Sequence, residues 1–304
     1  MKLATTTGDF ERYCPTYEER ITHIVGAGFR YIDLSLYTVT PEDALLGNTN
    51  WQDNAKRLLE HAQSLGAAFV QAHSVGFNPL EEDAFWQTGF DATVRSLEIC
   101  QLLGIPNTVV HAGWRRGISI EEFFELNKAF YEKLFPYMEK TGVNVLTENS
   151  TPANMGDRPY IISGADTRAF ADYVNHPLFH VCWDTGHANI QGNQYDDIIT
   201  LGDHLRAVHI NDNRGTGDEH IIPYLGTVNL DEIMHALKDV GFQGAFTFEC
   251  NTTLRPGKCW HGNRQAFPED TRLLEPQLFM QDDLEKLLYH VGEHALKTYG
   301  CFEE

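Results

Sequence analysis

Short apolar runs alternate with longer amphipathic segments along most of the chain. The short runs are rich in β-branched and aromatic residues, as strands are, and the longer segments carry apolar residues at helical spacing. Eight strands are predicted on this basis, at residues 2–6, 31–34, 68–73, 108–111, 144–148, 180–184, 207–210 and 245–249. Eight helices are predicted after them, at residues 17–27, 54–65, 85–103, 120–141, 166–174, 195–201, 230–240 and 277–298.

This alternation predicts an α/β fold built on a parallel sheet. Eight strands that are each followed by a helix suggest a single-domain (β/α)₈ TIM barrel over residues 1–304, and an open doubly wound sheet stays an alternative. A dinucleotide-binding sheet is disfavoured, because no G-x-G-x-x-G opens a helix after the first strand. No linker, repeat or low-complexity tract divides the chain.

One stretch interrupts the alternation. Residues 251–275 form a connection that is too long for an ordinary loop between a strand and a helix. This insertion is either a lid over the strand ends or a static packed loop, and the sequence favours neither.

Six of the predicted strands end in a residue that can bind a metal: His73, His111, Glu148, Asp184, His209 and Glu249. Successive members lie 38, 37, 36, 25 and 40 residues apart, which is about one strand–helix unit each time. In a barrel, all six side chains would reach the C-terminal rim, where the active sites of this fold lie. Taken singly, each residue could be a hydrogen-bonded core histidine or a carboxylate that caps the next helix, but the shared register favours a common site.

Part of this set suits one divalent ion. Three carboxylates and one imidazole make an oxygen-rich site for Mn²⁺, Mg²⁺ or Co²⁺ that also accepts Zn²⁺, and the four residues are Glu148, Asp184, His209 and Glu249. Without a cation, buried carboxylates would repel one another and take up protons. Further candidates for an additional metal, or for contacts around the first one, are His73, His111, His187, Asp218 and His220.

The net charge of the chain limits the kinds of partner that it can bind. A formal net charge of −20 repels phosphate backbones and anionic membranes, so we expect a small, neutral or metal-chelated substrate and no nucleic acid or membrane partner. The first residues lack the pattern of a signal peptide, and no apolar run approaches the roughly 18 residues that span a bilayer, so a cytoplasmic protein is expected. The six cysteines include no C-x-x-C pair, which argues against a zinc ribbon or a disulfide framework.

The strand-end motifs, taken as a set, resemble the xylose isomerase-like superfamily of TIM barrels over about residues 2–249. They are Q-A-H at His73, V-V-H-A-G at His111, T-E-N at Glu148, C-W-D-T-G-H-A at Asp184 and His187, V-H-I-N-D at His209, F-E-C at Glu249, and D-E-H-I-I-P-Y-L-G from Asp218 and His220 to Gly226. The superfamily contains isomerases and epimerases of sugars and sugar phosphates, inosose dehydratases, and abasic-site endonucleases related to endonuclease IV.

Similarity to the ketose 3-epimerases in this superfamily implies one Mn²⁺- or Co²⁺-like ion, held by Glu148, Asp184, His209 and Glu249. It also implies that Glu148 and Glu249 are the catalytic acid/base groups on opposite faces of a ketose, and that His187 and Arg214 contact the substrate. Two neighbouring residues are further substrate-binding candidates. Arg115 could hold a phosphate or carboxylate, or else belong to a solvated turn, and Trp114 could stack on a sugar ring.

Similarity to endonuclease IV implies a different site, with up to three Zn²⁺ ions and nine ligands. The chain has a candidate for each ligand: His73, His111, Glu148, Asp184, His187, His209, Asp218, His220 and Glu249. The net charge and the lack of basic recognition loops argue against DNA as the substrate.

We therefore expect a metal-dependent isomerase or epimerase of a sugar, sugar phosphate or polyol, which acts through an enediolate. An inosose-type dehydratase and a trinuclear-zinc phosphodiesterase stay alternatives. A non-catalytic sugar-binding protein is disfavoured, because simple binding would not require two carboxylates placed for proton transfer. Association into homo-oligomers, which is common for such barrels, is left open.

Overall fold

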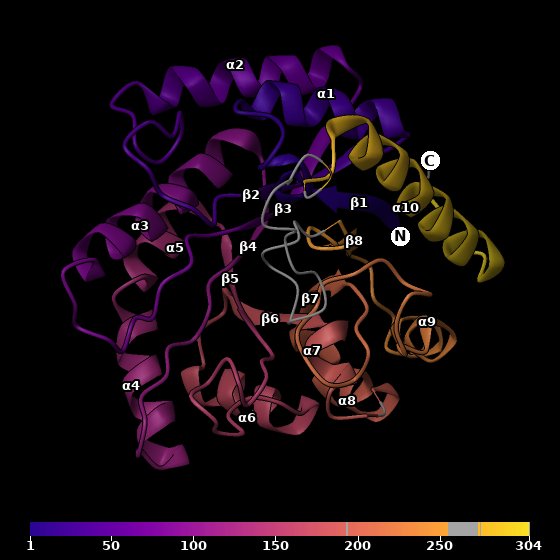
Figure 1. The fold of residues 1–304 in the computed structure, drawn as a ribbon. Coiled ribbons are helices and arrows are strands. Elements are labelled where there is room, and N and C mark those ends of the chain that lie inside the picture. Colours follow the sequence, from indigo (N-terminus) through magenta and orange to yellow (C-terminus); the bar gives the residue numbers. More distant parts are fainter. Residues whose placement is uncertain (193, 255–272, 274, 304) are drawn as a thin grey trace.

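A computed structural model describes residues 1–192, 194–254, 273 and 275–303. Eight parallel strands form a closed barrel in chain order, and helices surround it (Figure 1). The strands are β1 (Lys2–Thr6), β2 (Tyr31–Ser35), β3 (Ala68–His73), β4 (Asn107–Val109), β5 (Asn144–Glu148), β6 (Phe179–Asp184), β7 (Leu205–Ile210) and β8 (Ala245–Phe248). Because β1 pairs with both β2 and β8, the open-sheet alternative is wrong and the predicted (β/α)₈ barrel is confirmed.

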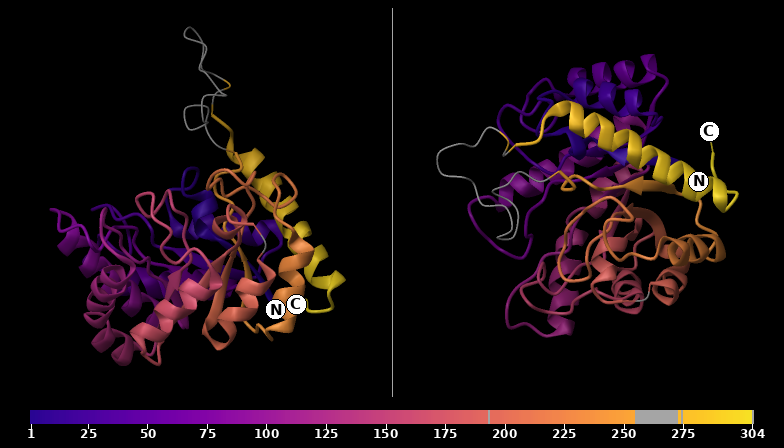
Figure 2. Two further views of the ribbon diagram at one scale, coloured as in Figure 1. Left: turned by 90° about the horizontal axis from the view of Figure 1, so that it is seen from below. Right: turned by 45° about the vertical axis from the view of Figure 1, so that its right-hand side comes forward.

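The helices flank the strands on the outside of the barrel (Figure 2). They are α1 (Tyr17–Ala27), α2 (Trp51–Ser64), α3 (Trp86–Leu103), α4 (Ile120–Glu132), α5 (Phe135–Thr141), α6 (Gly164–Val174), α7 (Thr185–Asn189), α8 (Tyr195–Leu201), α9 (Leu230–Asp239) and α10 (Leu278–Thr298), with 3₁₀ turns η1 (Thr7–Phe10) and η2 (Gly202–His204). Among the described residues, no helix has both the length and the apolar character needed to cross a bilayer. Most of the expected lid, residues 255–272 and 274, lies outside the described residues.

Local signals explain where several helices begin. Thr16 and Glu19 form a reciprocal capping box at the start of α1, in which each side chain accepts a hydrogen bond from the other residue's backbone N–H. Ser119 and Glu122 do the same at the start of α4. Such boxes satisfy amide groups that the first helical turn leaves without partners, and so they fix the first residue of the helix.

The structure corrects three details of the predicted elements. The single helix expected at 120–141 is two helices, because Pro136 has no amide hydrogen and its ring would collide with the preceding turn of a continuous helix. Strands β4 and β8 end early, so His111 and Glu249 lie in the loops just past them. The short helix α7 was not predicted; its five residues are too few to show a helical period.

The interior of the barrel has two chemically different halves. On the side of β4 to β7, four residues form a separate apolar cluster: Val109, Leu146, Cys182 and Ala207. On the side of β2, β3 and β8, the buried side chains are polar. Gln71 donates to Asp33 Oδ2 at 3.5 Å and accepts from the hydroxyl of Thr247 at 3.4 Å. Hydrophobic side chains between the strands and the helices form the main core.

Helix α10 packs against α1 beside β1 and carries a buried carboxyl group into that contact. Glu285 of α10 and Asp9 of η1 interact there, and both are almost fully buried. Thr5 donates to Asp9 at 3.2 Å, and Gln281 donates to Glu285 at 3.4 Å. Burial raises the pKa of Glu285 to about 7, and burial together with the charge of Glu285 raises the pKa of Asp9 well above its usual value.

This pair should make stability depend on pH. The folded protein holds the Glu285 proton up to about pH 7, whereas an unfolded chain releases it near pH 4.5, so the free energy of unfolding falls as the pH rises through that window. We expect Glu285→Gln to reduce this fall by up to about 3 kcal/mol, as measured by urea unfolding between pH 5 and pH 8. The control is Asp283→Asn, an exposed carboxylate on the same helix, which should follow the wild-type profile. Parallel profiles for Glu285→Gln and the wild type would contradict the assignment.

Candidate metal centre and active site

The C-terminal ends of the strands surround a cavity of about 570 Å³. Seven of the nine predicted ligands line it: His73, His111, Glu148, His187, Asp218, His220 and Glu249. The other two, Asp184 and His209, are fully buried. The register predicted from the strand ends therefore brings all of these side chains to one end of the barrel.

Four of the residues converge closely enough to hold one ion. One donor atom each from Glu148, Asp184, His209 and Glu249 lies within 4.8 Å of the other three. Ligands bound at about 2.0–2.6 Å from one ion lie within about 5 Å of one another, so the spacing fits. His209 is central in this group, since its Nδ1 is 2.5 Å from Glu148 Oε1 and 3.2 Å from Glu249 Oε2. The donor set of three carboxylates and one imidazole suits a divalent metal.

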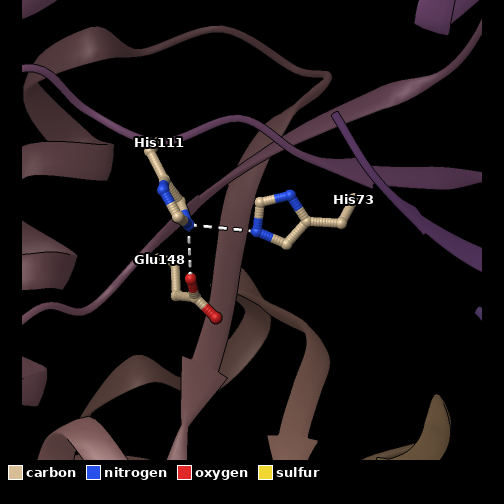
Figure 3. A group of neighbouring side chains, drawn as sticks. All are labelled: His73, His111 and Glu148. Carbon is tan, nitrogen blue, oxygen red and sulfur yellow. Dashed lines mark hydrogen bonds and ion pairs between the residues drawn. The ribbon is translucent and has the colours of Figure 1, made fainter. Parts of the chain in front are cut away.

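Two further groups adjoin this one and share residues with it. His111 Nε2 donates to Glu148 Oε2 at 2.7 Å and lies 3.1 Å from His73 Nε2 (Figure 3). On the other side, His187 Nε2 and His220 Nε2 contact the two oxygens of Asp218 at 3.2 and 2.9 Å. Donor atoms of Asp184, His187 and His220 also lie within 4.8 Å of one another.

Three of the histidines are oriented by backbone carbonyl groups. His73 Nδ1 donates to the carbonyl of Ser74 at 2.8 Å, and His187 Nδ1 donates to that of Asn149 at 2.8 Å. His220 Nδ1 donates to the carbonyl of Glu249 at 3.2 Å. A carbonyl can only accept, so each Nδ1 carries a proton and each Nε2 faces the site. Metal-binding histidines are commonly fixed in this way.

Charge balance within the cluster shifts the pKa values of its members. Burial would raise the pKa of Glu148, but the positive charge of His209 and hydrogen bonds from His111 and His209 hold it well below its usual range. Burial opposes a charge on His209, but Cys182, Glu249 and Glu148 outweigh it and raise the pKa of His209 well above its usual value. In the protein alone, imidazolium groups thus neutralise the carboxylates.

The pKa values of Asp218 and its histidine neighbours are set by the same balance of burial and charge. Burial alone would raise the pKa of Asp218, but the neighbouring His187 and His220 hold it far below its usual range. Burial disfavours charge on His220 as well, yet Asp218 raises the pKa of His220 to about 10. His73 differs, because burial and the nearby His111 lower its pKa and keep its ring neutral.

The loop that carries Asp218 and His220 is held by Asp212. The carboxylate of Asp212 accepts from the backbone N–H groups of Gly226 and Val228, each at 2.9 Å, and its backbone pairs in both directions with Ile221. His220 has a left-handed backbone with φ of 44°, which costs on the order of 1 kcal/mol and is maintained by these contacts. At Gly226, a Cβ would lie 2.2 Å from Asp212 Oδ1, so only glycine fits.

A family model described as the xylose isomerase-like TIM barrel matches residues 21–276. The chain belongs to this family. The match confirms the resemblance seen in the strand-end motifs, and it includes the nine residues of the cluster.

Proteins with different names resemble this chain. A "probable endonuclease 4" of Methanoculleus marisnigri is 29% identical over 185 residues, which are 53% of this chain and 62% of that protein. An L-ribulose 3-epimerase of Methylomonas sp. is 33% identical over 124 residues, 40% of each chain. The matched segments therefore span less than two thirds of these relatives. The structure of D-psicose 3-epimerase with D-tagatose from Clostridium cellulolyticum H10 has a TM-score of 0.75 at 17% identity, covering 97% of this chain and 99% of the other, which shows a shared fold.

The predicted substrate-binding residues of this family member fall into two groups. Trp114 and His187 line the cavity. Arg115 instead donates to the backbone carbonyl of Leu80 at 2.7 Å, and Arg214 forms an ion pair with Glu219. Among the described residues, neither arginine belongs to the cavity lining.

Several cavity residues had no predicted role. Tyr37 packs edge-on against both His73 and His111, and Asn154 donates to Asp218 at 3.0 Å. Both lie in loops that follow strands, but loop position alone does not reveal which side chains turn inward. Asp212, although it stands in the V-H-I-N-D motif, was likewise given no role.

We expect this family member to bind Mn²⁺ more tightly as the pH rises. The raised pKa of His209 means that its imidazole is protonated at neutral pH when no ion is bound, so an ion must displace that proton. Release of one proton per ion gives an affinity increase of about tenfold per pH unit. Isothermal titration of EDTA-treated protein at pH 6, 7 and 8 measures this slope.

Matched variants identify the site. Glu249→Gln should weaken Mn²⁺ binding by about tenfold or more at every pH. Glu11→Gln replaces an exposed carboxylate at the cavity lining, outside the four-residue group, and should keep the wild-type affinity. Equal losses in both variants would mean that the acidic field of the cavity, and not the four-residue group, attracts the ion.

Proposed function

We propose that the protein is a divalent-metal-dependent epimerase or isomerase of an unphosphorylated ketose or related polyol. The observation that carries this proposal is the placement of two carboxylates, Glu148 and Glu249, on one imidazole nitrogen at the base of the cavity. An ion bound there would polarise the substrate carbonyl and a neighbouring hydroxyl group and so ease loss of the adjacent C–H proton.

The two glutamates supply the proton transfers. The pKa of each is below its usual range; burial opposes this, and His209 outweighs it in both cases, so both can be deprotonated at neutral pH. One carboxylate removes the proton from the carbon next to the carbonyl. In an epimerase, the other glutamate would take up a proton from water and deliver it to the opposite face of that carbon, while the proton on the first glutamate is released to water. In an isomerase, the proton returns to the neighbouring carbon.

The walls of the cavity favour an uncharged sugar. Four carboxylate residues line it, namely Glu11, Glu148, Asp218 and Glu249, while no lysine or arginine does so in the described part of the chain. A phosphate group would find no lysine or arginine among the described lining residues to pair with, and His187 and His220 are already paired with Asp218. Trp114, Tyr37 and Phe77 add aromatic surface that can pack on the apolar face of a sugar ring. The names of the similar 3-epimerases, which refer to free ketoses, support the same substrate class.

Deuterium exchange tests this function directly. The wild type, loaded with Mn²⁺ in D₂O, should exchange one C–H hydrogen next to the carbonyl of a ketose from a panel of D-psicose, D-tagatose, L-ribulose and D-fructose. The phosphates of these ketoses and an inosose are tested beside the panel, and exchange is followed by NMR after removal of the ion. Glu148→Gln should slow this exchange by at least about 10²-fold, because the acid/base group is lost. Asp283→Asn, which removes an exposed carboxylate outside the cavity lining, is the control and should exchange at the wild-type rate.

Other results would redirect the assignment. An unchanged rate in Glu148→Gln would refute the proton-transfer role. Exchange that is followed by loss of hydroxide from an inosose would indicate the dehydratase alternative. Exchange of sugar phosphates in preference to free ketoses would contradict the unphosphorylated substrate class.

A second candidate function is hydrolysis of a phosphodiester at a three-zinc site. The observations that favour it are the convergence of eight of the nine residues in adjoining groups, with Asp218 in contact with His187 and His220, and the similarity to a probable endonuclease 4. The formal charge of −20 and the acidic cavity oppose the binding of DNA.

Metal content distinguishes the two functions. We expect elemental analysis to find one ion per chain, and His111→Ala to keep it, because His111 lies outside the four-residue group. Three zinc ions per chain, a loss of zinc in His111→Ala and cleavage of an abasic oligonucleotide would together establish the hydrolase instead.

A further inference from the structure

A buried carboxylate lies beneath the candidate metal centre and does not line the cavity. Asp33 projects into the barrel interior from β2, and its Oδ2 lies 3.4 Å from Nε2 of His209 on β7. Both side chains are almost fully buried, at 1% and 0% exposure. The opposite ring nitrogen, Nδ1, faces Glu148 and Glu249. The imidazole of His209 thus separates Asp33 from the site.

From this arrangement we propose that Asp33 is a positioning residue, which fixes the ring orientation and the tautomer of His209 for metal binding. The proposal rests on the proposed metal site. Nδ1 of His209 can bind an ion only through its lone pair, so the proton of the neutral ring must be on Nε2. A carboxylate next to Nε2 accepts that proton in a hydrogen bond, stabilises this tautomer and makes Nδ1 a stronger ligand.

His209 differs in this respect from the other histidines of the site. His73, His187 and His220 are each oriented by a neutral backbone carbonyl. His209 Nε2 instead faces a carboxylate, with Asp33 Oδ2 at 3.4 Å as an ion-pair contact, and it makes no hydrogen bond within the described residues. An ionised acceptor makes a stronger hydrogen bond than a neutral one. The Asp33 carboxylate would therefore favour a proton on Nε2 of His209 more strongly than a neutral carbonyl at the same distance.

Asp33 in turn depends on His209 as its cationic partner. Among the described residues, His209 is the one basic side chain within 4.0 Å of the Asp33 carboxylate, and Asp33 Oδ1 has no hydrogen-bond partner. Burial of an unpaired carboxylate is costly. The N–H of His209 offsets this cost, so each group satisfies a requirement of the other.

The polar half of the barrel interior holds Asp33 in place. Gln71 donates to Asp33 Oδ2 and accepts from Thr247, which links β2 through β3 to β8. Thr247 stands two residues before Glu249, so the same chain of hydrogen bonds approaches the metal centre from below. On the opposite half of the interior, Cys182 lies close to Glu148 and His209.

Asp33→Asn tests the proposal, because asparagine keeps the size of the side chain and removes its charge. We expect the Mn²⁺ affinity, measured by titration, to fall about 10- to 100-fold, which is the usual loss when a carboxylate that orients a metal-binding histidine is removed. Asp33→Glu retains the carboxylate and should restore most of the affinity. Thr247→Val is the structural control. It removes the hydroxyl that donates to Gln71 but leaves the Asp33 carboxylate in place, so it should change the Mn²⁺ affinity by less than about threefold.

A spectroscopic measurement reports on the tautomer itself and requires no variant. In the Zn²⁺-loaded wild type labelled with ¹⁵N-histidine, we expect His209 to bind through Nδ1 and to show a protected Nε2–H proton in long-range ¹H–¹⁵N spectra. That proton should exchange faster in Asp33→Asn. Binding of His209 through Nε2, or wild-type affinity with an unchanged Nε2–H signal in Asp33→Asn, would overturn the proposal.

The outcome is separable from that of the proposed function. If Asp33→Asn weakens Mn²⁺ binding while the wild type exchanges no ketose hydrogen, the positioning role stands and the proposed reaction fails. If the wild type exchanges ketose hydrogen while Asp33→Asn binds Mn²⁺ as tightly, the reaction stands and the positioning role fails.

Discussion

Repulsion among carboxylates at the mouth of the barrel is the constraint on which the rest of the site depends. Glu148, Asp184, Asp218 and Glu249 meet in a small volume, and such a group is stable only when positive charge is placed among its members. The chain supplies that charge with histidines, which form ion pairs with each carboxylate. A divalent ion can replace these protons, so the same geometry serves both the empty and the loaded protein.

The fold was predictable from the sequence because its signals are local. Each strand–helix unit repeats a short apolar run and an amphipathic segment. The polar residue at the end of each run therefore lies at the same edge of the barrel. The break at Pro136 was also visible in principle, since proline within a long helical pattern ends the helix. The short helix α7 was not, because a single turn has no measurable period.

The site was predictable only in part, for a different physical reason. His73 and Asp184 end their strands, so position along the chain identifies them. The role of Asp33 depends on which residue of β7 lies across the barrel, and no pattern within β2 contains that information. Substrate contacts by Arg115 and Arg214 stay predictions, and in the structure Leu80 and Glu219 engage these two side chains.

The four-residue turn η1 contacts both the cavity and the C-terminal helix α10. Gly8 lines the cavity, while the next residue, Asp9, turns away to meet Glu285 of α10. Two consecutive residues therefore connect the buried carboxyl pair at the C-terminal helix with the wall of the space where substrate would bind.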